Sequence, residues 1–562
     1  MLKLKVADIQ ERIFLTFITL FIFFYRLGAY GLFDNNEGLY AEIAHEILLS
    51  GNFVIPTLNG APYIEKPPLL YWLIAVSFKV FGVGEYSARM VPALAGFSTV
   101  WGVYFFMRRF KSTHAAFYSA VMLTTSIGFI TFSHMIFFDV LLTCFLTFAL
   151  LFYFEWWRTT EKKNLIAFYI FMAAAVMTKG GVALVLVGTT LIAFWIVERR
   201  GWSWVLNSFN PLGILLFLFF VVPWHVMASF QDPNFLHFYF INEHVYRFLD
   251  IREPRDYYRG PWYYYLHRLA LYLLPWLPLL GCRTSSNNNI EHRSLIRFLL
   301  CWMIVFLCFF SLSKAKANYY IVTLMPAIFV YFGLQLGSPS KESLTGLKRF
   351  SALIAGGLFP FILSFSPLIT WFFNFPYRVY MEEINLYYFV GTLGLLWIFY
   401  GIALVQCRNN IRVWIFTIAL QSVVVWFYAH MVIVQYESRV SSKEIAKTIP
   451  QNVDHIYFYK DYEKMSSIRF YLNRPVYVID SLSNDLYYAK KYGLSPYFVT
   501  EEQWKKNADT PMCVFVFHEQ KTQFEQKYPR FTSISRPFGK REIFSDRVFL
   551  YCTQLHSKAF EK

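Results

Sequence analysis

The stretch Asp139-Val-Leu-Leu-Thr-Cys-Phe-Leu-Thr-Phe-Ala-Leu-Leu-Phe-Tyr-Phe154 decides the class of fold. It carries one charged residue, Asp139, at its first position, and everything after it suits a lipid environment. With its neighbours it forms an apolar segment over 138–156, close to the ~20 residues that a membrane-spanning helix needs. An acid at the start of a span is a functional candidate by default. The alternative is an acid that only favours the positive end of the helix dipole.

Apolar segments of this kind recur along the chain. Of its 562 residues, 56% are hydrophobic, 21% aromatic and 16% charged, whereas soluble domains are roughly 45–50% apolar and about 25% charged. This composition excludes a cytosolic enzyme, a disordered protein and a secreted disulfide scaffold. Segments of span length predict a polytopic α-helical membrane protein with about 13 transmembrane helices, at 12–30, 88–107, 114–133, 138–156, 164–178, 181–198, 211–229, 262–281, 298–313, 318–336, 351–372, 387–406 and 413–434.

The net charge of +16 is explained by membrane orientation. Lys and Arg concentrate in cytoplasmic loops, and alternate connections here carry them, among them Arg108 with Arg109 and Arg199 with Arg200. This pattern predicts a cytoplasmic N-terminus and, with an odd number of spans, an external C-terminus. The basic balance therefore needs no nucleic-acid partner.

The sequence predicts two domains. Residues 1–434 form the transmembrane domain, with two long external loops at 31–87 and 230–261. Residues 435–562 alternate strand-like runs (455–459, 475–479, 513–517) with polar helical segments, which predicts a small external α/β domain. Cys513 and Cys552 are its two cysteines and could pair in an oxidising compartment; the alternative is two buried free thiols.

The first external loop opens with carboxylates and a helical pattern. Asp34 and Glu37 are candidate catalytic acids, and their spacing also suits a helix N-cap and its N3 partner. In the helix that follows, apolar residues share one face, and Glu42, His45 and Glu46 share the other. We expect this helix to lie on the membrane surface.

Further charged groups fall on the same predicted side. Glu65 and Lys66 stand between aromatic residues and a double proline, where lysine suits a phosphate; snorkelling side chains are the alternative. In the second loop, Glu243, His244 and Arg247 lie within one helical turn. Lys314 and Lys316, followed by Tyr319 and Tyr320, predict a cationic rim for a lipid phosphate headgroup. No phosphate-binding glycine loop stands out, so no nucleotide is expected.

The order of these motifs resembles a known family. The order is Tyr40-Ala-Glu-Ile-Ala, Tyr63-Ile-Glu-Lys-Pro, an Asp opening a span, Thr178-Lys-Gly, Glu243-His…Arg-Phe and Ser313-Lys-Ala-Lys…Tyr-Tyr. The chain resembles, over nearly its whole length, the bacterial ArnT-like glycosyltransferases, which are related to the dolichyl-phosphate-mannose protein mannosyltransferases. The resemblance implies a GT-C fold and an inverting transfer from a polyprenyl-phosphate sugar donor, without a nucleotide. The best-known members move 4-amino-4-deoxy-L-arabinose from undecaprenyl phosphate to lipid A, at the periplasmic face of the bacterial inner membrane.

The resemblance also implies roles for individual residues. Asp139 matches a catalytic candidate, and Lys66, Tyr320 and, more loosely, Arg247 match groups that hold the donor phosphate. Glu65 and His244 match positions that can hold zinc, with a third ligand from the outer domain, either His455 or His518. One position departs from the family: Asn36 stands where an Asp usually precedes the Glu. Either Asp34 reaches the site by a local shift, or Glu37 takes the role.

Two mechanisms and several functions remain open at this level. If the acceptor is a hydroxyl, Asp34 or Glu37 would serve as base; a phosphate acceptor is already ionised and needs little base. Protein O-mannosyltransferase-like or other envelope glycan transfer is an alternative acceptor choice. A transporter or lipid flippase is the alternative class, but it would place ionisable groups along a path near the bilayer midplane.

Overall fold

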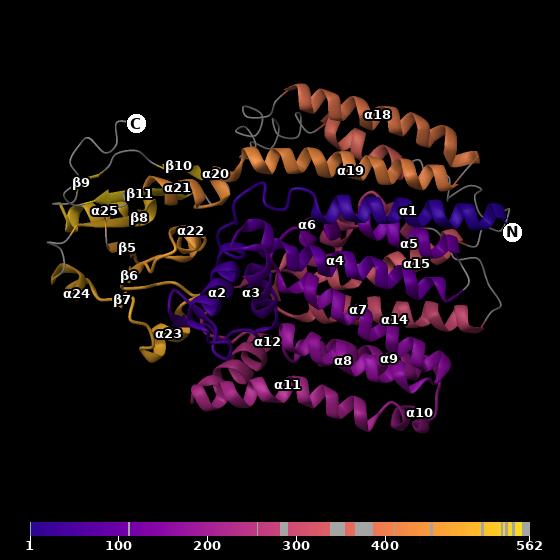
Figure 1. Cartoon of the computed structure of the whole chain (residues 1–562), viewed down its shortest axis with the longest axis horizontal. Coiled ribbons are helices and arrows are strands. Elements are labelled where there is room, and N and C mark those ends of the chain that lie inside the picture. Colours follow the sequence, from indigo (N-terminus) through magenta and orange to yellow (C-terminus); the bar gives the residue numbers. More distant parts are fainter. Residues whose placement is uncertain are drawn as a thin grey trace. The chain divides into compact units, whose positions relative to one another are not determined.

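Contacts divide the chain into two compact units. One unit, here called the helical unit, comprises 1–27 and 89–431, and the other, the outer unit, comprises 28–88 and 432–562. Figure 1 shows the elements of both. The computed structural model describes residues 2–110, 113–255, 257–281, 290–337, 354–365, 386–409, 411–449, 453, 455–506, 511–529, 532–533, 538–541 and 546–552.

Apolar helices build the helical unit. They are α1 (Leu2–Phe24), α4 (Glu85–Arg108), α5 (Thr113–Thr125), α6 (Ile127–Ser133), α7 (Phe138–Thr159), α8 (Lys162–Lys179), α9 (Val182–Glu198), α10 (Trp202–Asn207), α11 (Pro211–Gln231), α12 (Arg247–Leu249), α13 (Tyr264–Tyr272), α14 (Ile290–Leu312), α15 (Met325–Gly337), α18 (Leu386–Asn409) and α19 (Ile411–Gln435). A π-helix, η1 (His237–Tyr246), and two 3-10 helices, η2 (Leu277–Gly281) and η3 (Asn318–Leu324), interrupt them. In Figure 1, α7, α8, α9 and α14 run side by side.

The helices fit a membrane by length and composition. Seven of the described helices are long and apolar enough to span it, and α5 with α6, bent by 63°, would make an eighth. Shorter apolar helices, among them Val182–Glu198 and Ile354–Phe365, do not reach that length. The expected number of about 13 spans is therefore not established by the described helices, and 351–353 and 366–372 of one expected span lie outside the described residues.

Burial separates inner from peripheral helices. α7 is buried along most of its length, whereas α11 exposes large apolar side chains such as Phe219, Phe220 and Phe230. A continuous exposed apolar face suits contact with lipid. Inside the unit, helices approach closely: a Cβ added at Gly333 of α15 would lie 2.6 Å from the carbonyl oxygen of Ala115 in α5. Small residues permit such contacts in membrane bundles.

The outer unit joins the first external loop to the C-terminal part of the chain. The loop supplies α2 (Glu37–Ser50), β1 (Thr57–Leu58), β2 (Ala61–Pro62) and α3 (Leu69–Phe81). The C-terminal part supplies α20 (Glu437–Val440), α21 (Lys443–Thr448), β5 (His455–Tyr459), η4 (Glu463–Met465), α22 (Ile468–Leu472), β6 (Tyr477–Ile479), α23 (Tyr487–Tyr492), β7 (Phe498–Val499), α24 (Glu501–Lys506), β8 (Met512–Phe517), α25 (His518–Lys527), β9 (Thr532–Ser533), β10 (Phe538–Arg541) and β11 (Asp546–Cys552).

A mixed sheet organises the C-terminal part. Its strand order is β10-β11-β8-β5-β6-β7, with β9 beside β11. β5 pairs in parallel with β6 and β8, and β8 pairs antiparallel with β11. The strand-like runs at 455–459, 475–479 and 513–517 coincide with β5, β6 and β8. A core that includes Tyr459, Trp504 and Phe524 covers the sheet.

Cys513 and Cys552 both lie in strands of this sheet. Cys513 is disulfide-bonded, and Cys552 lies directly opposite it in the register of β8 and β11. Directly opposite positions of an antiparallel pair bring two Cβ atoms within disulfide reach. Of the two alternatives, a free thiol at Cys513 is therefore wrong.

One expectation for the first loop is wrong. The polar face of α2 does not lie at a surface, because Glu42, His45 and Glu46 are all buried. Arg469 of α22 explains this burial. Its Nε lies 3.0 Å from Glu42 Oε1, and its guanidinium also contacts Glu46. The sequence pattern could not reveal this partner, which lies more than 400 residues away.

Candidate functional site

A buried ion pair joins two neighbouring helices of the helical unit. Asp139 lies in the first turn of α7 and Lys179 in the last turn of α8. Lys179 Nζ is 2.6 Å from Asp139 Oδ1, with 14% and 2% of the side chains exposed. An acid at a helix N-terminus and a base at a C-terminus each complement the helix dipole. Asp139 therefore does lie where an acid favours the helix dipole. Its ion pair with Lys179 gives it a specific partner as well.

Aromatic rings enclose the ammonium group of this pair. Lys179 Nζ lies 4.1 Å from the ring centroid of Tyr320 and 5.7 Å from that of Tyr319. The Tyr319 ring stacks on Phe137, with centroids 4.5 Å apart. A cation over an aromatic face is stabilised, and more strongly where water is scarce. The structure thus brings Asp139 and Tyr320 together through Lys179.

His244 lies against the turn that follows Lys179. Its Nε2 accepts a hydrogen bond from the Gly181 N–H at 3.1 Å, and its Nδ1 lies 2.7 Å from the Tyr239 carbonyl oxygen. Burial lowers the pKa of His244, which favours the neutral ring that this acceptor role requires. Both ring nitrogens are therefore engaged with the backbone.

Glu243 connects two arginines of the second loop. Arg252 Nε lies 2.6 Å from Glu243 Oε1, and Arg247 Nη1 lies 3.3 Å from Glu243 Oε2. Arg252 is fully buried and also donates to the Pro254 carbonyl oxygen. Arg247 keeps 27% of its side chain exposed. The pair Arg252–Glu243 therefore organises the loop from inside, and Arg247 lies at its edge.

The expected lysine rim is corrected by the structure. Lys316 is buried, and its Nζ donates to the carbonyl oxygens of Phe310 at 2.8 Å and Ser311 at 2.7 Å. It thereby caps the C-terminal end of α14, which would otherwise leave carbonyls unsatisfied. Lys314 is exposed, with Nζ 3.8 Å from Asp250 Oδ2. Of the two lysines, only Lys314 is placed as a rim residue.

Asp34 holds distant parts of the outer unit together. Its Oδ1 accepts from Ser467 Oγ at 2.7 Å, from the Ser467 N–H at 2.9 Å and from Ser442 Oγ at 3.0 Å. Its own N–H donates to the Val440 carbonyl oxygen. These contacts tie the first loop to α20, α21 and α22.

Glu37 begins α2 and is fully buried. Its Oε2 accepts from the Phe33 N–H at 3.1 Å. The N-cap residue is Asn36, without a side-chain cap hydrogen bond. The alternative in which Asp34 caps the helix is therefore wrong, because Asp34 lies two residues before the N-cap and bonds to Ser442 and Ser467 instead.

Glu65 and Lys66 lie near two tyrosines of the first loop. Lys66 Nζ is 3.9 Å from Glu65 Oε2 and 5.9 Å from the Tyr40 ring centroid. The Tyr63 hydroxyl donates to Glu65 Oε2 at 3.3 Å. Lys66 keeps 18% of its side chain exposed, so it is a mostly enclosed cation rather than a snorkelling side chain.

Glu65 and His244 are the residues that the resemblance assigns to zinc. Among the described residues, no three or more His, Cys, Asp or Glu side chains are grouped to hold a metal ion. Both ring nitrogens of His244 are occupied by backbone partners. The bond from the Gly181 N–H to Nε2 does not fit a metal ligand at that nitrogen, and zinc stays a prediction of the resemblance.

Sequence reasoning missed three cations that the structure makes central. For Lys179, which is given no role in the sequence analysis, the usable signal was its place at the end of an apolar helix before two glycines. Arg252 and Arg469 lie in a loop and in the five-residue helix α22, where no periodicity marks a buried residue.

Comparisons with known proteins agree with this architecture. The family model described as dolichyl-phosphate-mannose-protein mannosyltransferase matches residues 65–227. An "Undecaprenyl phosphate-alpha-4-amino-4-deoxy-L-arabinose arabinosyl transferase" of Shewanella sediminis is 28% identical over 341 residues, 58% of this chain and 60% of that protein. A protein of the same name, numbered 1, from Pseudomonas fluorescens is 29% identical over 400 residues, 69% of this chain and 70% of that protein.

A solved structure is similar over almost the whole chain. The crystal structure of ArnT from Cupriavidus metallidurans bound to undecaprenyl phosphate has a TM-score of 0.79 at 21% identity, covering 97% of this chain and 98% of that one. The alignment with the Shewanella protein spans less than two thirds of that relative, so the fold likeness extends further than the sequence likeness. The resemblance given by the motif order is confirmed: the chain is similar in sequence to transferases of this kind, and it has the GT-C membrane fold of ArnT.

Proposed function

We propose that the chain is an integral-membrane glycosyltransferase that moves a sugar from a polyprenyl phosphate, such as undecaprenyl phosphate, to an acceptor outside the cytoplasm. The observation that carries the proposal is the buried Lys179, bonded to Asp139 and enclosed by Tyr319 and Tyr320. A fixed cation among aromatic rings at the ends of apolar helices suits the phosphate of a lipid carrier. The names of the relatives give the same donor.

The reaction is a direct displacement at the anomeric carbon. An acceptor oxygen forms a bond to that carbon while the bond to the phosphate oxygen breaks, and polyprenyl phosphate leaves with the electron pair. Arg247, Tyr320 and Lys314 of the helical unit are the proposed contacts of the phosphate, and Lys179 adds a cation close to Tyr320. Positive groups that are already in place stabilise the growing negative charge without reorganisation.

The carboxylates have distinct proposed tasks. Asp139 keeps Lys179 in position. A hydroxyl acceptor would give its proton to Glu37 or Asp34. A phosphate acceptor needs no base, and the carboxylate would then orient it or stabilise positive character on the sugar.

The proposed sugar and acceptor are 4-amino-4-deoxy-L-arabinose, or a related sugar, and lipid A. Support comes from the names of the curated relatives. A second candidate is transfer to a protein or another envelope glycan, which the description of the matching family model favours. The two candidates share the donor chemistry and differ in the acceptor.

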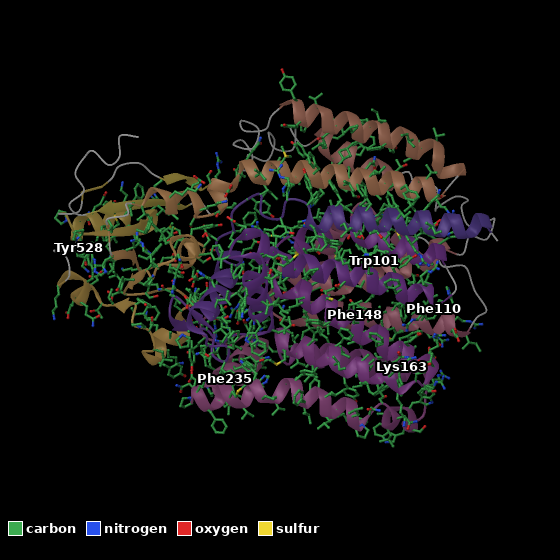
Figure 2. All side chains as sticks on the ribbon, in the orientation of Figure 1. Trp101, Phe110, Phe148, Lys163, Phe235 and Tyr528 are labelled. Carbon is green, nitrogen blue, oxygen red and sulfur yellow. The ribbon has the colours of Figure 1, made fainter. Side chains whose placement is uncertain are left out.

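The proposed location is the bacterial inner membrane, with a cytoplasmic N-terminus and a periplasmic active site and C-terminal part. In Figure 2, Phe110 and Lys163 lie at one end of the helical unit and Phe235, in the second loop, at the opposite end. Lys163 belongs to one of the basic short loops of the sequence, and such loops are typical of the cytoplasmic side. The disulfide at Cys513 also suits an oxidising compartment.

The test is transfer by purified protein in detergent. Undecaprenyl phosphate carrying aminoarabinose is offered with lipid A, or with acceptor peptides, and products are read by mass spectrometry. Transfer to lipid A without an ion gradient is expected, and it would be lost in Asp139→Asn. Transfer to peptides alone would show that the acceptor is a protein and not lipid A. Lipid movement without any transfer would favour the flippase alternative.

A further inference from the structure

His244 occupies an unusual backbone setting. It lies in the ten-residue π-helix η1, and such segments often mark functional positions. Because a backbone N–H can only donate, the bond from Gly181 makes His244 Nε2 the acceptor. The ring proton then lies on Nδ1 and is donated to the Tyr239 carbonyl oxygen. The orientation and the tautomer of the ring are thus both fixed by backbone groups.

The turn that His244 contacts has no room for a side chain at Gly180. Gly180 has φ +74°, and a Cβ there would lie 2.4 Å from His244 Nε2 and 2.7 Å from the Tyr239 hydroxyl. Gly180 therefore lets the imidazole approach the backbone directly. Lys179 is the residue immediately before this turn, and its Nζ reaches Asp139.

Aromatic packing holds the imidazole from behind. The Tyr239 ring is 4.9 Å from the His244 ring, edge to face, and Tyr239 also packs on Trp224 and Phe235. This wall prevents the ring from leaving the turn. The backbone after Lys179 is therefore held by one directed hydrogen bond, which the Gly181 N–H donates to this ring.

We propose that His244 is a positioning residue for Lys179: it fixes the Gly180–Gly181 turn and so keeps the ammonium group at Asp139 and Tyr320. This role differs from the metal-ligand role implied by the resemblance, because Nε2 cannot accept the bond from the Gly181 N–H and coordinate a metal at the same time. The effect on turnover rests on the proposed transfer activity. The effect on Lys179 itself does not.

The experiment compares three variants of the full-length protein. His244→Phe keeps an aromatic ring but removes the acceptor, and His244→Gln offers an amide oxygen that can accept from Gly181. His225→Phe is the matched control. His225 packs on Tyr239 and Phe240, and its Nδ1 bonds to the Val221 carbonyl oxygen, not to the turn.

Three readouts are recorded: lysine labelling followed by mass spectrometry, steady-state transfer, and bound metal. In His244→Phe, we expect labelling of Lys179 to rise and kcat to fall, each by about tenfold for one lost hydrogen bond, with little change in KM. His244→Gln should restore both values, and His225→Phe should match the unmodified protein. Metal content should be the same in all four.

Each contrary result overturns the role. Zinc bound in the unmodified protein and lost in both His244 variants would make His244 a metal ligand. Unchanged Lys179 labelling in His244→Phe would show that the turn does not depend on the ring. Because labelling needs no sugar donor, absent transfer with increased labelling would contradict the proposed function and leave the positioning role intact.

If His244→Phe does not fold, the contact is tested from the glycine side. Gly180→Ala should displace the ring and raise Lys179 labelling, whereas Gly181→Ala, whose Cβ would lie 3.4 Å from His244 Cδ2, should leave it unchanged. Equal labelling in these two variants would also overturn the proposal.

Discussion

Lys179 and Asp139 form a short ion pair, 2.6 Å between Nζ and Oδ1, in which both side chains are largely withdrawn from solvent. Breaking a buried pair leaves one uncompensated charge, which typically costs about 3–5 kcal/mol. Asp139→Asn and Lys179→Met should therefore each lower the thermal unfolding midpoint and abolish transfer. The double variant Asp139→Leu with Lys179→Met should recover stability and remain inactive.

A surface pair provides the control for this prediction. Lys163 and Glu161 lie 3.0 Å apart with 76% and 49% of their side chains exposed. Exposed pairs contribute little to stability, so Glu161→Gln should change neither stability nor transfer. A double variant of Asp139 and Lys179 that still transferred sugar would contradict a functional pair.

Substitutions of Glu37 and Asp34 should affect different measurements, transfer for Glu37 and stability for Asp34. A glutamine at position 37 can still accept from the Phe33 N–H, so Glu37→Gln should keep the unfolding midpoint. With a hydroxyl acceptor, it should reduce transfer by about 10²-fold or more. Asp34→Ala removes the acceptor of the Ser442 and Ser467 bonds and should lower the unfolding midpoint. Full transfer activity in Glu37→Gln would show that Glu37 does not act as the base.

Glu46 should make stability depend on pH. Burial raises the pKa of Glu46 to about 7; Arg469 opposes this shift, and the nearby Glu42 adds to it. A carboxyl whose folded pKa is raised stabilises the fold at low pH, and this contribution is lost as pH rises through about 7. The unfolding midpoint should fall between about pH 5 and 8, and less steeply in Glu46→Gln.

The control for this pH effect is Glu444, whose pair with Lys447 is more than half exposed. Glu444→Gln should retain the full pH dependence. Identical profiles for Glu46→Gln and the unmodified protein would show that Glu46 does not titrate in this range.

Substitutions of Lys316 and Lys314 should have different effects on stability, although the two lysines are only two positions apart. Lys316→Met removes two bonds to the carbonyl oxygens that end α14, and each is worth about 0.5–1.5 kcal/mol or somewhat more for a charged donor. Lys314→Met removes only a long, exposed contact with Asp250. The thermal unfolding midpoint should therefore drop clearly for Lys316→Met and little for Lys314→Met. A larger drop for Lys314→Met than for Lys316→Met would instead support the lysine rim expected from the sequence.

Much of the architecture followed from apolar runs, since each is local in sequence. The segments expected at 138–156 and 211–229 coincide with α7 and α11, and the runs at 455–459 and 513–517 coincide with β5 and β8. The polar face of α2 was placed wrongly because Arg469, which neutralises it, lies far along the chain. Residue spacing cannot report such a partner.

By itself, the sequence determined that this is a membrane protein of apolar helices, with chemistry-bearing residues in an ordered set of motifs that resembles the set in ArnT. Hydropathy and motif order are properties of neighbouring residues, so they can be read without a fold. Tertiary structure alone decided which partners these residues have: Lys179 for Asp139, Gly181 for His244, Ser467 for Asp34 and the end of α14 for Lys316. Each partner is decided by how buried charges and hydrogen-bonding groups are satisfied in three dimensions, which depends on distance in space and not on distance along the chain.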